Sequence, residues 1–140
     1  MVKNVSRVLL HAPVSRIWAA LTQPELVKQW QYGSELTTSW AVGSEIRFRA
    51  VWEAQTFEQW GTVLEYLLET RLRYSLFAPR EGLVDTPENR FVMVYELRPG
   101  NGGTELVITQ EDDRAGAVAE PDQGEGNPVL ATLKRVVEGS

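Results

Sequence analysis

The sequence contains no cysteine and a single histidine, His11, among its 140 residues. The absence of cysteine excludes disulfide bonds, thiol nucleophiles and cysteine-based metal sites. One histidine excludes histidine-rich metal clusters. His11 lies at an expected strand-to-helix corner without a serine or cysteine nucleophile motif beside it, so its expected role is to satisfy backbone groups. We therefore expect neither a metal site nor a cofactor.

Long apolar runs are also missing. The longest, residues 91–95, is far shorter than the ~20 residues that span a bilayer. The first residues contain no apolar stretch followed by a small-residue cleavage site, so no secretory signal is visible. These features predict a cytoplasmic protein without a membrane partner. A chain of 140 residues that is 43% hydrophobic is long enough for one core, and we expect a single domain over residues 1–140.

Basic residues are outnumbered, with 14 lysines and arginines against 19 acidic residues and a net charge of −5. Such a molecule repels nucleic acid and anionic membranes unless a local basic patch overrides its average charge. The nearest approach to a patch is Arg47 and Arg49 with Arg71 and Arg73, spaced as on the solvent face of a strand. The acidic run at 111–113 is likewise expected to be solvated. We expect no nucleic-acid partner.

The chain begins with a strand and two short helices. Residues 5–10 form a β-prone run. Residues 14–21 then carry apolar side chains at the i, i+3, i+4 and i+7 spacing of an amphipathic helix that begins after Pro13. A second helix begins at Pro24 and ends at residues 32–34. The two helices form an elbow in which Gln23 is a weak N-cap.

Period-two alternation predicts antiparallel strands over the next part of the chain, at residues 45–52, 56–66, 71–76, 91–97 and 104–110. Gly61, inside the second of these, indicates a bulge or a close approach to another backbone. Residues 99–103 are a strong turn signal between the last two strands.

The end of the chain supplies the cover for this sheet. Residues 112–126 are polar and acidic and are expected to loop freely, whereas residues 129–137 recover helical spacing. A sheet with one apolar face needs a cover, and the last helix is the only candidate of sufficient length. The predicted fold is therefore α+β, a helix-grip: a curved antiparallel sheet wrapped around a C-terminal helix, with two short helices after the first strand.

This order resembles the START/Bet v 1-like (SRPBCC) superfamily, and specifically its AHSA1-type branch, related to the C-terminal domain of the Hsp90 ATPase activator. Residues 12–30 are similar to the pattern of that branch: Ala-Pro, a Val/Ile-Trp-x-x-Leu-Thr helix, Pro-Glu and a tryptophan. Weaker matches at 43–48, 61–65, 71–74 and 103–108 extend the resemblance over nearly the whole chain. Residues 126–128 depart from it, because they read Gly-Asn-Pro where relatives often have Gly-Trp. This departure and the short last helix leave the shape of the cavity mouth open.

The resemblance implies a cavity between sheet and helix that binds a hydrophobic small molecule or a lipid-like ligand, and this is the expected function. A solid core made of the same side chains is the alternative. The tyrosines among them offer hydrogen bonds in an apolar pocket. The candidate ligand-binding residues are Trp30, Phe48, Trp52, Val63, Tyr74, Leu76, Met93, Tyr95, Ile108 and Gln110.

Two other functions stay open. Glu65 shares the inward parity, and a carboxyl group in an apolar pocket has a raised pKa and can act as a general acid or base in a cyclase- or hydrolase-like reaction. A bulge at Gly61 would instead turn Glu65 outward and bring Leu64 in. The resemblance also implies an Hsp90 ATPase activator-like interaction with a chaperone, for which Trp40 and Trp60 are candidate anchors unless they pack internally. The expected state is a monomer or weak dimer.

Overall fold

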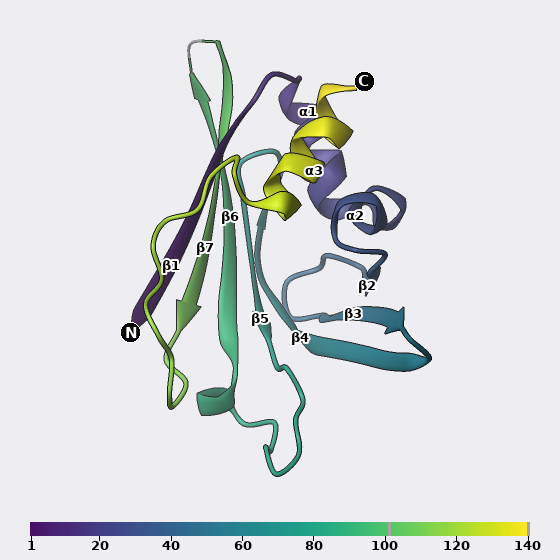
Figure 1. The fold of residues 1–140 in the computed structure, drawn as a ribbon, viewed down its shortest axis with the longest axis vertical. Coiled ribbons are helices and arrows are strands. Elements are labelled where there is room, and N and C mark those ends of the chain that lie inside the picture. The colour runs from purple at the N-terminus through teal and green to yellow at the C-terminus, as the bar shows by residue number, and fades with distance from the viewer. Residues whose placement is uncertain (101, 140) are drawn as a thin grey trace.

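The computed structural model describes residues 1–100 and 102–139, whose strands form one seven-stranded antiparallel sheet in the order β1-β7-β6-β5-β4-β3-β2 (Figure 1). Three α-helices and a short 3-10 helix complete this part of the chain. The elements are β1 (Val2–Leu10), α1 (Val14–Thr22), α2 (Pro24–Trp30), β2 (Glu35–Thr38), β3 (Glu45–Trp52), β4 (Gln55–Leu67), β5 (Arg71–Leu76), η1 (Pro87–Asn89), β6 (Phe91–Gly100), β7 (Gly103–Asp112) and α3 (Pro128–Glu138).

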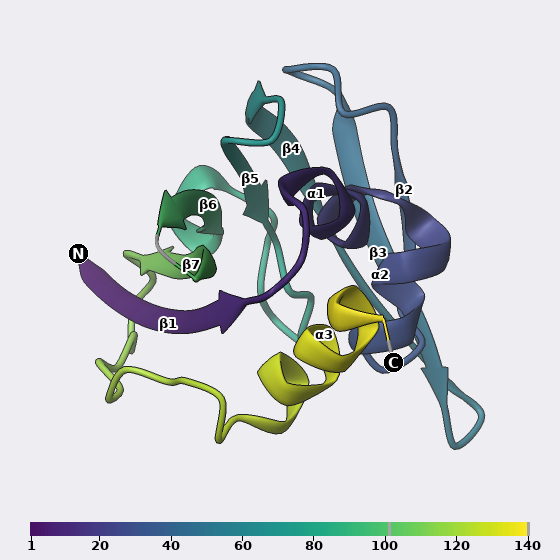
Figure 2. The ribbon, with the colours of Figure 1, turned by 90° about the horizontal axis from the view of Figure 1, so that it is seen from above.

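The predicted α+β helix-grip is confirmed. The sheet curves, and all three α-helices lie on its concave side (Figures 1 and 2). One strand was missed: β2 is only four residues long, too short to display an alternation, and it pairs with residues 46–49 of β3. The predicted turn at 99–103 joins β6 to β7, although its Asn101 lies outside the described residues.

The elbow of α1 and α2 closes the upper end of the concave side. Ile17 of α1 and Val27 of α2 are completely buried. The two tryptophans of the elbow satisfy their ring N–H groups internally: Trp30 Nε1 donates to the Ala20 carbonyl at 2.7 Å, and Trp18 Nε1 donates to the Tyr66 hydroxyl at 3.0 Å. Because a buried N–H without a partner is costly, these bonds fix where each ring sits.

Helix α3 packs against α1, α2 and β1 through Leu130, Leu133 and Val137. Asn127 is its N-cap and accepts the Val129 N–H at 2.9 Å, Pro128 occupies the first turn, and Gly139 ends it with a left-handed φ of 75°. Helix α3 is only 11 residues long and lies over the upper half of the sheet. In Figure 1, none of the described α-helices covers the lower half of the concave face.

The segment between β7 and α3 does not loop freely, as the sequence predicted, but runs beside β1 as a strap (residues 113–127). The backbone of Gln123 makes two hydrogen bonds to β1. Its carbonyl accepts from the Arg7 N–H and its N–H donates to the Val5 carbonyl, each at 3.0 Å. The Asn4 side chain donates to the Val118 carbonyl and accepts the Glu120 N–H. Strand β1 is a sheet edge with free backbone groups, and the strap satisfies some of them.

Strand β4 bends at two places. Gly61 lies against β5, where a Cβ atom would overlap the Ser75 carbonyl, so the predicted close approach is confirmed. The register with β5 then shifts between Val63 and Glu65, which makes Leu64 the extra residue of a β-bulge. The bend turns the β3–β4 hairpin away from the body as a projecting arm (Figures 1 and 2).

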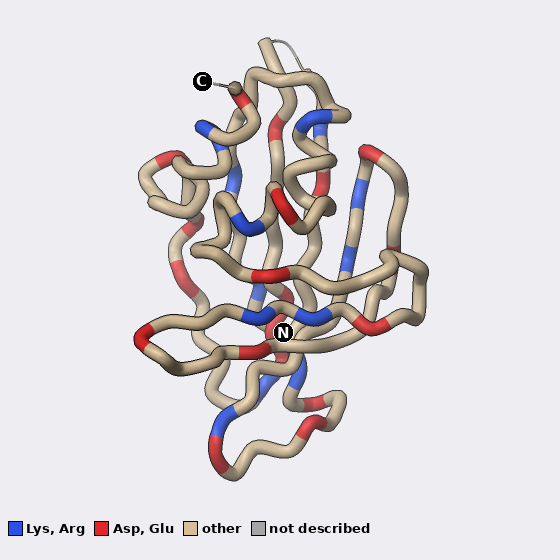
Figure 3. Tube along the Cα trace, turned by 90° about the vertical axis from the view of Figure 1, so that its right-hand side faces the viewer, with Lys and Arg blue, Asp and Glu red and all other residues tan. Residues whose placement is uncertain are grey.

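The convex face of the sheet carries ion pairs, as expected for the paired arginines. Arg47 contacts Glu58 at 2.8 Å and Arg71 contacts Glu65 at 3.0 Å. Figure 3 shows basic and acidic positions interspersed along the chain. Trp60 also lies on this face, where it packs on Phe77 and donates to the Asp85 carboxylate at 2.9 Å.

The close approach at Gly61 yields a stability prediction. We expect Gly61→Ala to lower the free energy of unfolding by about 2–3 kcal/mol, because the methyl group must displace the backbone of a central strand. Thermal or urea unfolding measures this loss. Gly126→Ala is the matched control, since a Cβ atom there meets nothing within 4 Å. Equal stability of the two variants would contradict this packing.

Candidate ligand-binding groove

Two adjoining cavities form a groove on the concave face, one on its uncovered lower half and the other where that half meets α2 and α3. The first, the arm cavity, has a volume of about 390 Å³ and lies between the β3–β4 arm and strands β5–β7. The second, the helix cavity, has a volume of about 470 Å³ and lies beneath the N-terminus of α3 and the α2–β2 loop. The two share Gln31, Ser34, Met93, Tyr95 and Gln110, so they form one continuous groove.

Eight of the ten candidate residues line this groove. Phe48, Tyr74 and Leu76 line the arm cavity, and Trp30 and Ile108 line the helix cavity. The other three are common to both: Met93, Tyr95 and Gln110. The alternation of β5, β6 and β7 brings these side chains together, because adjacent strands place directly opposite residues on the same face.

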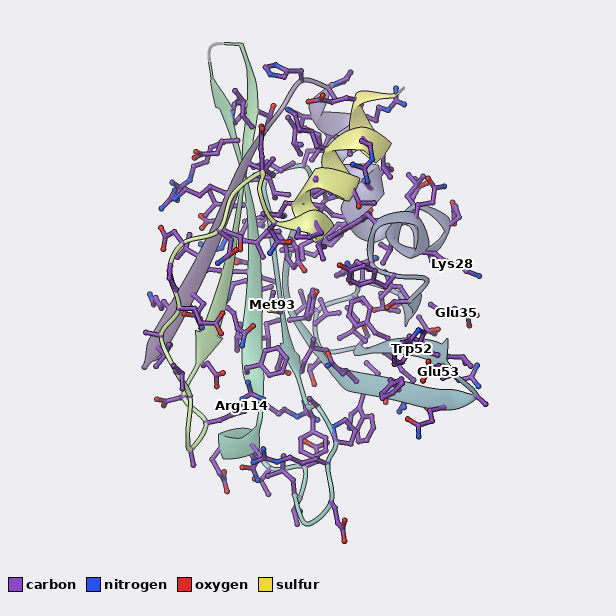
Figure 4. All side chains as sticks on the ribbon, viewed as in Figure 1. Lys28, Glu35, Trp52, Glu53, Met93 and Arg114 are labelled. Atoms are coloured by element: carbon purple, nitrogen blue, oxygen red, sulfur yellow. The ribbon has the colours of Figure 1, made fainter. Side chains whose placement is uncertain are left out.

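The remaining two candidates lie elsewhere. Val63 is completely buried in the core and lines neither cavity. Trp52 lies at the tip of the arm with 67% of its surface exposed (Figure 4). Trp52 lies on the same face of β3 as Phe48. The arm projects from the body, however, so Trp52 at its tip lies beyond the cavity.

Two buried tyrosines form the polar centre of the groove. The Tyr74 and Tyr95 hydroxyl oxygens are 3.0 Å apart and hydrogen-bonded, and their rings stack with centroids 5.8 Å apart. Burial raises the pKa of both phenols, because the charged phenolate is poorly solvated there. Both therefore remain protonated near neutral pH and act as neutral hydrogen-bonding groups.

A row of aromatic rings supports Tyr74 from behind. Trp40 lies between Tyr66 and Tyr74, with centroid distances of 5.8 and 6.2 Å. Its ring N–H donates to the Thr22 carbonyl at 3.0 Å, so Trp40 ties the elbow to the sheet. Of the two alternatives for Trp40 and Trp60, the contacts favour internal packing, because both rings pack on another ring and both ring N–H groups have partners within the chain.

A third cavity of about 470 Å³ adjoins the groove, shares Met93, Ile108 and Gln110 with it, and contains an ion pair at the lower edge of the sheet. Asp112 is 5% exposed and faces inward. Arg114 donates to both of its carboxylate oxygens, at 2.8 and 2.6 Å, and the guanidinium group lies 4.4 Å from the centre of the Phe91 ring. The Arg114 hydrogen bonds lower the pKa of Asp112 to about 2. The carboxylate is therefore ionised at neutral pH and is fully engaged.

The expectation that Glu65 faces the groove is wrong. The bulge at Leu64 places Glu65 opposite Arg73 on the convex face, where it pairs with Arg71. The sequence left open a bulge that turns Glu65 outward, but it placed that bulge at Gly61. The bulge lies at Leu64, three residues later. Leu64 is not brought inward, since it is 37% exposed, and Tyr66 takes the inward position instead.

Several lining residues were not predicted. Gln31 and Ser34 come from the α2–β2 connection, which carries no periodic pattern, so the sequence holds no signal for them. Asp112 could have been found, because it has the same parity as Ile108 and Gln110. Its place in the acidic run at 111–113 instead predicts a solvated position, which fits its neighbour Asp113, whose side chain is 83% exposed.

The described residues contain no group of three or more histidine or acidic side chains arranged to hold a metal ion. Among the same residues, no helix is both long and apolar enough to cross a membrane.

The ion pair yields a pH-dependent stability prediction. Because the folded-state pKa of Asp112 lies below its unfolded value, the pair stabilises the protein above about pH 4, and this contribution is lost as the pH falls toward 2. We expect Asp112→Asn to lower the free energy of unfolding by about 2 kcal/mol near neutral pH. Below pH 4 the difference in unfolding free energy between the variant and wild type should shrink as the pH falls. Denaturant unfolding at several pH values measures it. Asp113→Asn should have little effect; an equal loss there would contradict the assignment.

Comparison with known proteins places the chain in a family. A comparison with curated proteins gives no significant match. Solved structures with the same fold include a protein from Cytophaga hutchinsonii, which is 29% identical over 83% of this chain and 80% of that chain, with a TM-score of 0.69. Another is a protein from Chromobacterium violaceum, which is 20% identical over 99% of this chain and 98% of that chain, with a TM-score of 0.77. The Aha1 dimer from Colwellia psychrerythraea is also similar, with 16% identity over 99% of this chain and 98% of that chain and a TM-score of 0.70.

The family model described as "Activator of Hsp90 ATPase homolog 1-like protein" matches residues 11–138. This match spans both helices of the elbow, the sheet from β2 onward and α3, and the solved structures share the fold. The chain therefore belongs to the Hsp90 ATPase activator homolog 1-like family, the branch that its sequence predicted.

Proposed function

We propose that this protein binds a small, largely apolar molecule in the groove. The observation that carries the proposal is the pair of continuous cavities on the uncovered half of the concave face. Apolar concavities with a few convergent polar groups are the usual form of small-molecule sites. Here Met93, Ile108 and Phe48 supply apolar surface, and Tyr95 and Gln110 supply the polar groups.

The division of the concave side into a packed and an open half supports this proposal. The upper half is solid, with Leu10 and Leu133 completely buried where the helices meet the sheet. The side chains of the lower half have the same strand alternation, but only the ends of α2 and α3 reach them. Met93, Ile108 and Phe48 are only partly buried although they pack against the core. A ligand there would cover apolar surface that the chain leaves uncovered.

The groove is less suited to the two alternative functions. Catalysis by a groove carboxylate loses its candidate, because Glu65 lies on the convex face. Asp112, at the groove end, is ionised and doubly bonded to Arg114, which leaves it a poor general acid. The family description names an Hsp90 ATPase activator, but Trp40 and Trp60, the candidate chaperone anchors, are engaged internally.

The test is a groove-filling substitution at Met93, which lies where the two cavities meet. Met93→Trp places a larger ring in the groove, and we expect the affinity for Nile red, a neutral apolar dye, to fall about tenfold or more. Fluorescence titration measures the dissociation constant. Val92→Trp is the matched control, because the adjacent residue of β6 points to the convex face.

Binding of the dye that survives Met93→Trp, or that is lost equally in Val92→Trp, would argue against the groove as the site. Circular dichroism on both variants verifies that the sheet is intact.

A further inference from the structure

We propose that the groove selects an electrically neutral ligand that carries a hydroxyl or carbonyl group, and rejects carboxylates and phosphates with the same apolar body. This inference rests on the proposed function and narrows its ligand class.

The first observation is the lack of charged side chains in the arm cavity and the helix cavity; the charged residues Asp112, Arg114 and Glu120 line a third cavity that adjoins them. Charged side chains make up 24% of the sequence, yet among the described residues none lines either the arm cavity or the helix cavity. The polar positions there are amides and hydroxyls: Gln31, Ser34, Gln59, Tyr74, Tyr95 and Gln110 in the arm cavity, joined in the helix cavity by others of the same uncharged kind.

The cation that lines the adjoining third cavity does not change this picture. Arg114 lies at the lower end of the concave side, below Met93 in Figure 4. Its guanidinium group is already bonded to both oxygens of Asp112 and stacked on Phe91. Because the pair is neutral as a unit, an incoming anion would have to compete with a carboxylate already in bidentate contact.

The tyrosine pair offers the ligand one hydrogen-bond donor. Two phenol groups carry two hydroxyl hydrogens, and the bond between Tyr74 and Tyr95 uses one of them whichever oxygen donates. The second hydrogen has no acceptor among the hydrogen bonds of the described residues. Both side chains line the arm cavity, so this hydrogen is available to a ligand oxygen there.

Gln110 offers the complementary acceptor. Its Nε2 donates to Asp112 Oδ2 at 3.3 Å. Since the ionised Asp112 can only accept, it fixes the orientation of the amide, with the NH₂ group toward the carboxylate. The carbonyl oxygen is then the atom that Gln110 can present to the groove. A hydroxyl group can use both this acceptor and the tyrosine donor.

A carboxylate in the same place would lose its hydration without gaining a counter-charge. Burying an unpaired charge costs far more than burying a neutral hydroxyl that finds its hydrogen bonds. The acidic net charge of −5 adds a repulsive background for anions. Geometry and charge therefore point to the same class, a neutral ligand with an oxygen function.

The test compares two fluorescent probes with the same body, pyrenebutanol and pyrenebutyrate, titrated into the full chain near neutral pH. We expect the alcohol to bind about tenfold or more tightly than the carboxylate. A smaller preference, or a preference for the carboxylate, overturns this inference while leaving groove binding in place. If neither probe binds, both this inference and the proposed function fail.

Two sets of variants test the cause. Gln31→Lys puts a cation at the shared wall of the groove, and we expect it to raise the affinity for pyrenebutyrate about tenfold. Gln29→Lys, two residues earlier on the exposed side of α2 and outside the groove, makes the same charge change and should leave both affinities unaltered. Equal responses of the two variants would contradict a local charge effect.

The tyrosine donor is tested with Tyr74→Phe, Tyr95→Phe and the double variant. Each single variant keeps one hydroxyl hydrogen for the ligand, whereas the double variant keeps none. We expect the double variant to bind pyrenebutanol about fivefold more weakly than either single variant. A double variant that binds the alcohol as tightly as wild type would remove the tyrosine pair from the explanation.

Discussion

The length of α3 is the constraint on which the rest of the concave side depends. An 11-residue helix is about 16 Å long, whereas the ten residues of β6 extend over about 33 Å. One such helix can bury only about half of the face it lies on. The upper half, joined by the elbow of α1 and α2, becomes a packed core, and the lower half leaves Phe48, Met93 and Ile108 partly exposed.

The composition of the open half follows from that constraint. Side chains that lie between core and water must be apolar over most of their surface and polar at a tip. Tyr95 and Gln110 meet this requirement in the middle of the groove. The charged pair of Asp112 and Arg114 lies at its lower end, where the two groups neutralise each other at the edge of the sheet. The groove is therefore uncharged but able to form hydrogen bonds.

The distortion of β4 shapes the other wall. Gly61 allows β4 to approach the backbone of β5, and the bulge at Leu64 changes which residues beyond it face inward. Together they turn the β3–β4 arm outward and give the arm cavity its outer side. The same bulge moves Glu65 to the convex face, so one local irregularity both forms the cavity wall and removes a candidate catalytic group.

Local pattern in the sequence was sufficient wherever strands are regular. The alternation along β6 and β7 correctly places Met93, Tyr95, Ile108 and Gln110 on one face, and the helical spacing correctly predicts α1, α2 and α3. Tertiary structure alone decided the facing of Glu65, the exposure of Trp52 and the entry of Gln31 into the groove. The reason is physical: periodicity records which side of its own element a residue occupies, whereas bulges, projecting hairpins and uncovered faces depend on where neighbouring elements end.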